Sequence, residues 1–259
     1  MSDAWDPSQY HRFREQRRKP FVDLLGLIEA VPGGRVVDLG CGTGELTVEL
    51  HRATGAVATL GVDSSAAMLD EAAKHAGNGV RFEAGDLATF EPGGEYDVVL
   101  SNAALQWVPD HAAVLARWTA GMREGAQLAV QVPANPDHPA HYVADDVARE
   151  APFADAFDGP LPADPLHEVL APAAYSALLD ELGYRDQHVR LQVYGLHFPT
   201  TADVAEWTKG TALTRFRRAL PPDLYDRFVD RYRARLVEVA GDHRPYFYPF
   251  KRILFWARR

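Results

Sequence analysis

The segment VVDLGCGTGE (36–45) constrains the fold more than any other part of the chain. A short β-branched run ends in three glycines, and a helical pattern begins directly after them. Glycine at such a place permits a tight turn and lets the backbone approach a ligand closely. The segment therefore predicts a buried strand, a ligand-binding turn and a helix in succession.

Strand and helix patterns alternate through the first half of the chain. Strands are predicted at 35–40, 56–63, 80–86, 96–102 and 126–133, and helices at 44–53, 64–76 and 110–122. This alternation indicates an α/β fold with a doubly wound, mostly parallel sheet covered on both faces. Ligands of such folds bind beyond the carboxyl ends of the strands.

The second half of the chain differs from the first in composition and in the order of its predicted elements. Residues 133–170 are rich in Pro, Asp and His and predict loops around a helix near 140–150, followed by a helix at 171–184. Alternating patterns at 188–198 and 251–259 predict two late strands, which bring the sheet to seven. The helical region between them predicts a cap inserted between the last two strands. The expected division is 1–34 (N-terminal lid helices), 35–133 (ligand-binding core) and 134–259 (the rest of the sheet with a cap at about 199–247).

Composition narrows the classes of partner. The formal net charge of −9 argues against non-specific nucleic-acid binding, which needs a basic face. The apolar stretches are shorter than the ~18–20 residues that span a bilayer. The lone Cys41 rules out an intrachain disulfide and, without a signal-peptide pattern, favours a cytoplasmic location. We expect no membrane contact and no obligate protein partner.

The glycine turn favours a cationic nucleotide ligand over a dinucleotide. The dinucleotide fingerprint G-x-G-x-x-G would require glycine where Glu45 stands. Asp38, at the end of the preceding strand, would repel a phosphate and attract a cation. The G-x-G-x-G pattern with this acid resembles motif I of the class I S-adenosylmethionine-dependent methyltransferases, which have a Rossmann-like fold.

That resemblance implies S-adenosyl-L-methionine as cofactor and S-adenosyl-L-homocysteine as product. It places Asp63 on the ribose hydroxyls, Asp86 and the amide of Leu87 at the adenine, and Asn102 close to where the methyl group emerges. For Asp63 or Asp86 alone, a helix-cap role is an equally open interpretation. The full set of predicted cofactor-binding residues is Asp38, Gly40, Gly42, Gly44, Asp63, Ser64, Asp86, Leu87 and Asn102.

Longer strings resemble one family within this superfamily. WDPSQYHRF (5–13), SNAALQWVPDH (101–111), EWTKGTAL (206–213) and YPFKRILFWARR (248–259) are similar to the trans-aconitate 2-methyltransferase family. The resemblance implies transfer of a methyl group to a carboxylate of a small polycarboxylic acid, trans-aconitate above all, giving a monomethyl ester. A carboxylate with a pKa near ~4 is already a nucleophile at neutral pH, so no general base is required.

The basic segment RFREQRRK (12–19) contrasts with the acidic chain around it. If 8–18 is helical, Arg17 lies about 20° from Tyr10 on the helical wheel, so both face the same side. We predict that Arg17 binds a carboxylate of the substrate, while Tyr10 closes over the cofactor or hydrogen-bonds the substrate. With Gln106 and Trp107 in the loop after the fourth strand, these are the candidate catalytic residues.

Further substrate-binding candidates come from the late segments: Trp207, Arg215, Lys251 and Arg252. Arg215 departs from the family pattern, in which GTALRP places the arginine one position earlier. A shift of one residue turns a helical side chain by about 100°, which leaves the identity of the acid open.

Three other interpretations remain open. The acceptor could be a malonyl carrier-protein thioester or a natural-product acid, since NAALQW (102–107) also resembles the malonyl enzyme. The chain could bind S-adenosylmethionine without catalysis. A hydrolase or metal enzyme is suggested by His138, His141, Asp145 and Asp146, but they lack a recognisable ligand spacing, and we expect no metal.

Overall fold

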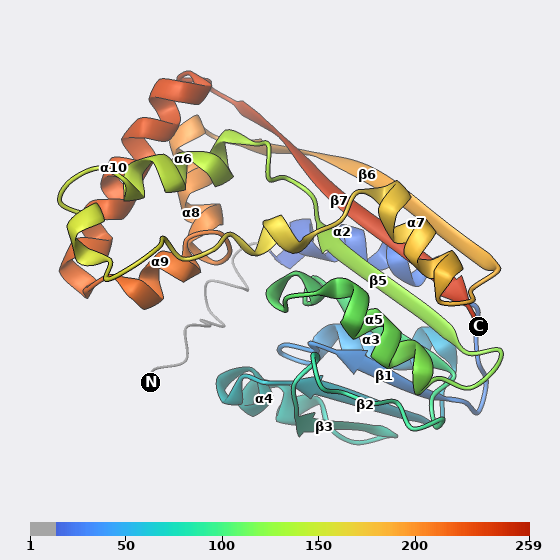
Figure 1. The fold of residues 1–259 in the computed structure, drawn as a ribbon. Coiled ribbons are helices and arrows are strands. Elements are labelled where there is room, and N and C mark those ends of the chain that lie inside the picture. The colour runs from blue at the N-terminus through green and yellow to red at the C-terminus, as the bar shows by residue number, and fades with distance from the viewer. Residues whose placement is uncertain (1–13) are drawn as a thin grey trace. The chain divides into compact units, whose positions relative to one another are not determined.

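The structure, a computed structural model, describes residues 14–259, and side chains from residue 18 onward. It contains a seven-stranded sheet with the order β3-β2-β1-β4-β5-β7-β6 (Figure 1). The strands are β1 (Arg35–Leu39), β2 (Ala58–Asp63), β3 (Val80–Ala84), β4 (Val98–Asn102), β5 (Gln127–Pro133), β6 (Asp186–Phe198) and β7 (Tyr246–Arg258). Strands β1 to β5 pair in parallel, and β7 runs antiparallel to β5. The predicted α/β fold with a mostly parallel sheet is confirmed.

Helices cover both faces of the sheet because successive strand residues point to opposite sides. On one face Val37 and Val99 pack with Trp118 of α5 (His111–Ala120) and Tyr175 of α7 (Pro172–Glu181). On the other face Val36 and its neighbours pack against α2 and α3. A third helix of this part of the chain, α4, follows β2. The bounds are α2 (Arg14–Leu25), α3 (Glu45–Thr54) and α4 (Ala66–Ala72).

The described part of α2 differs from the helix expected at 8–18. It runs through Pro20 and ends at Leu25. Phe21 and Leu24 are fully buried on the sheet. Burial of two large apolar side chains offsets the backbone hydrogen bond that a proline inside a helix removes.

The chain divides into two compact units. The sheet unit comprises 14–134, 168–192 and 252–259, and the helical unit comprises 135–167 and 193–251. The helical unit has its own apolar core, formed by Phe198, Tyr248 and four helices. These are α6 (Pro139–Ala148), α8 (Val204–Lys209), α9 (Thr214–Ala219) and α10 (Pro222–Ala240). Three of them, α8 to α10, are the predicted insertion between the last two strands, and α6 comes from the segment after β5.

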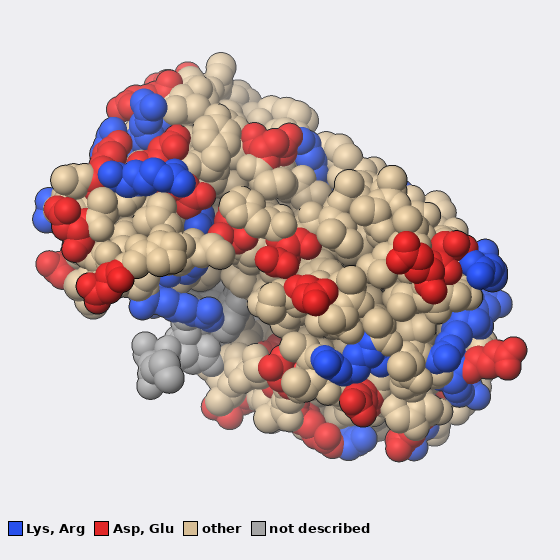
Figure 2. Space-filling model, in the orientation of Figure 1, with Lys and Arg blue, Asp and Glu red and all other residues tan. Residues whose placement is uncertain are grey.

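The surface is charged and mixed in sign. Figure 2 shows Lys and Arg interspersed with Asp and Glu on the face in view. Several of these side chains pair, as Arg231 does with Glu150 at 2.6 Å. Within residues 14–259, no helix combines the length and the apolarity needed to cross a bilayer.

Candidate active site

The glycine loop after β1 shows why three glycines are required there. Gly40, Gly42 and Gly44 all have positive φ, at 83°, 54° and 79°. A Cβ on Gly40 would overlap the side chain of Ala104, and one on Gly44 would lie 2.6 Å from the ring of Phe82. A Cβ on Gly42 would meet no atom of the described residues within 4 Å. Packing therefore excludes a side chain at Gly40 and Gly44, while the space beside Gly42 is open to a ligand.

Asp63 ties this loop to the end of β2. Its carboxylate accepts hydrogen bonds from the amide of Gly42 at 2.9 Å and from the amide of Ser65 at 2.9 Å. These two bonds hold the end of β2 against the glycine loop. Ser64, the predicted neighbour in the site, is exposed.

Asp38 lies on the α3 side of the sheet and is only 3% exposed. The hydroxyl of Thr47, on α3, donates to its carboxylate at 2.6 Å. Burial raises the pKa of Asp38 to about 7, against the lowering effect of the Thr47 hydrogen bond and with a further raising effect of the negative charge of Asp63. A cation bound nearby would stabilise the ionised form of this buried carboxyl group.

Asp86 and Leu87 follow β3, as predicted. Asp86 is exposed, and its carboxylate accepts from the amide of Ala88 at 2.9 Å. Leu87 is buried, and its carbonyl accepts from the indole of Trp118 at 3.0 Å. Asp86 therefore caps the turn that follows β3, and its side chain is still exposed to solvent.

Two side-chain amides pair at the end of β4, and a third lies in the turn that follows. Gln131 Nε2 donates to Asn102 Oδ1 at 3.0 Å, and Gln106 Nε2 donates to the carbonyl of Ala103 at 2.7 Å. The Oε1 atoms of Gln106 and Gln131 are buried and have no hydrogen-bond partner within residues 14–259. Trp107 is half-buried beside them in a short 3₁₀ turn.

Sequence reasoning did not single out Gln131. The signal available was a glutamine within the apolar run QLAVQVP (127–133) of a strand that the fold class predicts to be covered on both faces. A polar side chain in such a strand needs a partner, but the sequence does not say which one.

The carboxylates and acceptor oxygens of the sheet unit fit S-adenosylmethionine. This cofactor carries a sulfonium, an ammonium and two ribose hydroxyls, and it has no phosphate. Two carboxylates, at Asp38 and Asp63, and the buried acceptor oxygens of Gln106 and Gln131 suit cations and hydroxyl donors. The open side of Gly42 provides room for the backbone to meet the ligand.

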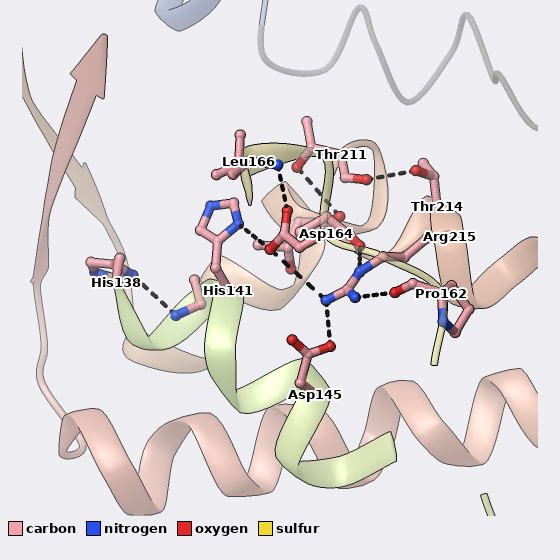
Figure 3. A network of polar contacts seen from close by, with 12 residues as sticks. His138, His141, Asp145, Pro162, Asp164, Leu166, Thr211, Thr214 and Arg215 are labelled. Atoms are coloured by element: carbon pink, nitrogen blue, oxygen red, sulfur yellow. Dashed lines mark hydrogen bonds and ion pairs between the residues drawn. The ribbon is translucent and has the colours of Figure 1, made fainter. Parts of the chain in front are cut away.

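The side chains that the sequence suggested as metal ligands have other partners. Asp145 and Asp164 both pair with Arg215, at 2.7 and 3.9 Å, and His141 lies 3.7 Å from Asp164 (Figure 3). His138 accepts from the amide of Ala140 at 3.0 Å. Within the described residues, no three His, Cys, Asp or Glu side chains come together as metal ligands would.

The predicted substrate-binding residues have several different environments. Arg215 is 8% exposed, and it also donates to the carbonyls of Pro162 and Ala212. Trp207 is buried, with its ring 5.2 Å from that of Phe250.

Lys251 and Arg252 are adjacent on β7 but belong to different units. Lys251 pairs with Asp137 at 2.6 Å. Arg252 is buried in the sheet unit, opposite Pro133 at the end of β5. Tyr10 and the side chain of Arg17 lie outside the described residues.

Comparison with known proteins shows the family of the chain. Residues 36–125 match the family model described as a methyltransferase domain. A trans-aconitate 2-methyltransferase of Deinococcus radiodurans is 44% identical over 260 residues, covering 99% of this chain and 98% of the relative. One from Streptomyces avermitilis is 37% identical, covering 99% and 97%.

Solved structures agree in fold. The YcgJ protein of Bacillus subtilis superimposes with a TM-score of 0.60 over 93% of this chain and 98% of its own, at 14% identity. The full-length similarity in sequence and the glycine loop with its acidic partners lead to one conclusion. The chain belongs to the trans-aconitate 2-methyltransferase family and is an S-adenosylmethionine-dependent methyltransferase.

Proposed function

We propose that the protein esterifies a carboxylate of trans-aconitate, giving the monomethyl ester and S-adenosylhomocysteine. The observation that carries the proposal is the 44% identity to a trans-aconitate 2-methyltransferase across 99% of the chain. The acid-lined glycine loop supports it, because its carboxylate acceptors and their negative charge suit a cationic nucleotide.

When bound, S-adenosylmethionine supplies an electrophilic methyl group on a positively charged sulfur. In the proposed site, Asp63 accepts the ribose hydroxyls, and Asp86 with the amide of Leu87 contacts the adenine. Gly42 lets the backbone approach, with Gly40, Gly44 and Ser64 shaping the loop. Asp38 provides negative charge below the loop, on the α3 side.

The acceptor needs no base from the protein. Its carboxylate is ionised at neutral pH, so it would accept the methyl group directly, and the electron pair of the broken carbon–sulfur bond would stay on sulfur. The protein's part is to hold the oxygen roughly 3–3.5 Å from the methyl carbon and to exclude water. Asn102, Gln106 and Trp107, after β4, are the described residues that we assign to this place.

Arginines suit the carboxylates that do not react, because a guanidinium binds a carboxylate with two parallel hydrogen bonds. We assign this part to Arg17 and to Arg252, which lies opposite the last residue of β5. Arg215 and Lys251 already contact protein carboxylates, which favours a structural role for both. For Arg17→Ala we expect the acceptor KM to rise at least about tenfold while the cofactor Kd stays unchanged; equal kinetics would remove Arg17 from the site.

The decisive experiment incubates the protein with S-adenosylmethionine and a panel of acids, then follows ester formation by mass spectrometry. The panel contains trans-aconitate, other di- and tricarboxylic acids, and a malonyl carrier-protein thioester. Preferential methylation of trans-aconitate supports the proposal. Preference for the thioester, or methylation of an alcohol or amine only, would overturn it.

A further inference from the structure

The side-chain amide of Asn102 is held in one orientation by Gln131. The two residues lie opposite each other in the register of β4 and β5, and Gln131 is 1% exposed. Gln131 Nε2 donates to Asn102 Oδ1 at 3.0 Å. In a planar amide the oxygen and nitrogen point in different directions, so binding Oδ1 turns Nδ2 away from Gln131.

The reverse orientation is less favourable. It would pair Gln131 Oε1 with Asn102 and leave the NH₂ group of Gln131, with its two donors, buried without an acceptor. In the observed orientation one N–H of Gln131 is bonded and Gln131 Oε1 has no hydrogen-bond partner within residues 14–259, so one fewer buried donor lacks an acceptor than in the reverse orientation. Buried donors that lack an acceptor are rare and costly, so the observed orientation of both amides is the more stable one.

An N–H donor at this position suits the proposed chemistry. A cation beside the reacting carboxylate would hold it firmly and weaken its attack, whereas a neutral amide orients one oxygen and leaves the negative charge in place. Gln106 is less suited to this role, because its Nε2 is directed to the carbonyl of Ala103 and its oxygen is the atom without a hydrogen bond. A carbonyl oxygen facing the acid would repel it.

We propose that Gln131 is a positioning residue for methyl transfer, acting by fixing Asn102 so that its N–H₂ group faces the reacting carboxylate. This inference rests on the proposed function, since it takes an anionic acceptor as substrate. It assigns a functional part to a side chain that is itself buried within the sheet.

The same strand offers a matched control. Gln127, at the other end of β5, is 3% exposed, and its side-chain amide hydrogen-bonds with Glu29 and Trp256. Each variant therefore removes one buried amide from β5. Gln131→Met removes it near the carboxyl end of the strand, and Gln127→Met removes it at the opposite end.

We expect Gln131→Met to lower kcat/KM for the acid at least about tenfold and to leave the cofactor Kd within about twofold. Gln127→Met should leave the acceptor kcat/KM within about twofold once both variants are assayed below their unfolding temperatures. Equal effects of the two variants on the acceptor, or an effect of Gln131→Met confined to the cofactor Kd, would overturn the inference.

A second readout does not need turnover. Gln131→Glu replaces the donor by a carboxylate, which on ionisation can only accept, so Asn102 should turn its N–H₂ group towards it. The chain has three asparagines, Asn78, Asn102 and Asn135, so selective ¹⁵N-asparagine labelling gives three side-chain amide pairs. We expect the Nδ2 protons of Asn102 to move downfield as pH rises in Gln131→Glu and to stay in place in Gln127→Glu.

The two proposals can fail separately. If the unaltered protein binds S-adenosylmethionine but methylates no acid, the proposed function fails, and the amide shifts alone decide whether Gln131 sets the orientation of Asn102. If trans-aconitate is methylated and the Asn102 shifts in Gln131→Glu do not respond to pH, the positioning role is wrong and the proposed function stands.

Discussion

Gly40 and Gly42 lie two residues apart in one loop, yet a methyl group added to each would meet different surroundings. At Gly42 it would meet none of the described residues, whereas at Gly40 it would overlap Ala104. We therefore expect Gly42→Ala to cost about 1 kcal/mol of stability, for its positive φ, and to weaken cofactor binding at least about tenfold.

Gly40→Ala should instead lower the unfolding temperature strongly, through overpacking. Calorimetric titration and thermal unfolding of both variants separate the two effects. Unchanged cofactor affinity in Gly42→Ala would show that the ligand does not use the open side of the loop.

Asp38 makes cofactor affinity depend on pH. With its pKa near 7, the carboxyl is largely neutral at pH 6 and ionised at pH 8. A cation binds the ionised form better, so the Kd for S-adenosylmethionine should fall between pH 6 and 8. S-adenosylhomocysteine, which lacks the positive sulfur, should show a smaller change. Titrations at both pH values check this, and Asp38→Asn should flatten the dependence.

The same residue has the opposite effect on the stability of the free protein. Its folded pKa lies above the usual value near 4, so the folded state binds more protons between about pH 4 and 7. Stability should therefore fall as pH rises through this range, by up to a few kcal/mol. Asp38→Asn should abolish this fall. Denaturant unfolding at pH 5 and 8 measures the free energy of unfolding of both proteins. If the unaltered protein gained stability relative to Asp38→Asn as the pH rises, the prediction would be wrong.

At the residue scale, the sequence predicts those features that the backbone itself demands. The glycines of the loop and Asp63 at the end of β2 could be identified because strand, turn and helix follow each other directly. The partners of Arg215 could not, since Asp145 and Asp164 come from a segment that ends about fifty residues earlier. Gln131 and Asn102 likewise become neighbours only once β4 and β5 pair.

At the scale of elements, the strands were predicted well because parallel strands buried on both faces are nearly continuous apolar runs. The exception is β7, which begins at Tyr246, five residues before the predicted start. Its first residues belong to the helical unit, where Tyr246, Tyr248 and Phe250 are buried in that unit's apolar core. The end of α2 was also hidden, because Pro20 reads as a stop and only the burial of Phe21 and Leu24 extends the helix beyond it.

His138 makes the start of α6 sensitive to acid. Its Nδ1 accepts from the amide of Ala140, and its Nε2 lies 3.1 Å from the hydroxyl of Tyr246. Burial, with the nearby His141, lowers the pKa of His138 to about 4, so the unfolded chain takes up a proton at higher pH than the folded one. Stability should fall as pH drops from about 6.5 to about 4, by up to about 3 kcal/mol.

His138→Asn retains an N-cap acceptor and has no titrating ring. The variant should be less stable at pH 7, because the contacts with Tyr246 and Tyr248 are lost, and should lose less stability between pH 7 and 5. Urea unfolding at both pH values measures the difference. His111, whose pKa burial also lowers, accounts for a remaining slope; an unaltered slope in the variant would exclude His138 as its source.

At the scale of the whole molecule, the chain crosses between its two units several times. The sheet unit contains every described residue expected to bind the cofactor, and the helical unit has a separate apolar core. A substitution that destabilises the helical unit should therefore leave the cofactor site intact. Arg215 is a suitable position for such a substitution, because its ion pairs join α9 to α6 and to the segment around Asp164.

Arg215→Met should destabilise the helical unit by about 3–5 kcal/mol, because it leaves the buried Asp164 and the half-buried Asp145 without their cation. Hydrogen exchange should rise across 135–167 and 193–251 and much less in the sheet unit, while calorimetry should give an unchanged cofactor Kd. Arg218→Met, at an exposed position on the same helix, is the matched control and should do neither. If Arg215→Met kept its native exchange pattern and raised only the acceptor KM, the guanidinium would bind substrate as the sequence first suggested. Adding Asp164→Asn distinguishes the cases, since it should restore stability lost to an unpaired buried charge but cannot restore a lost contact to the acid.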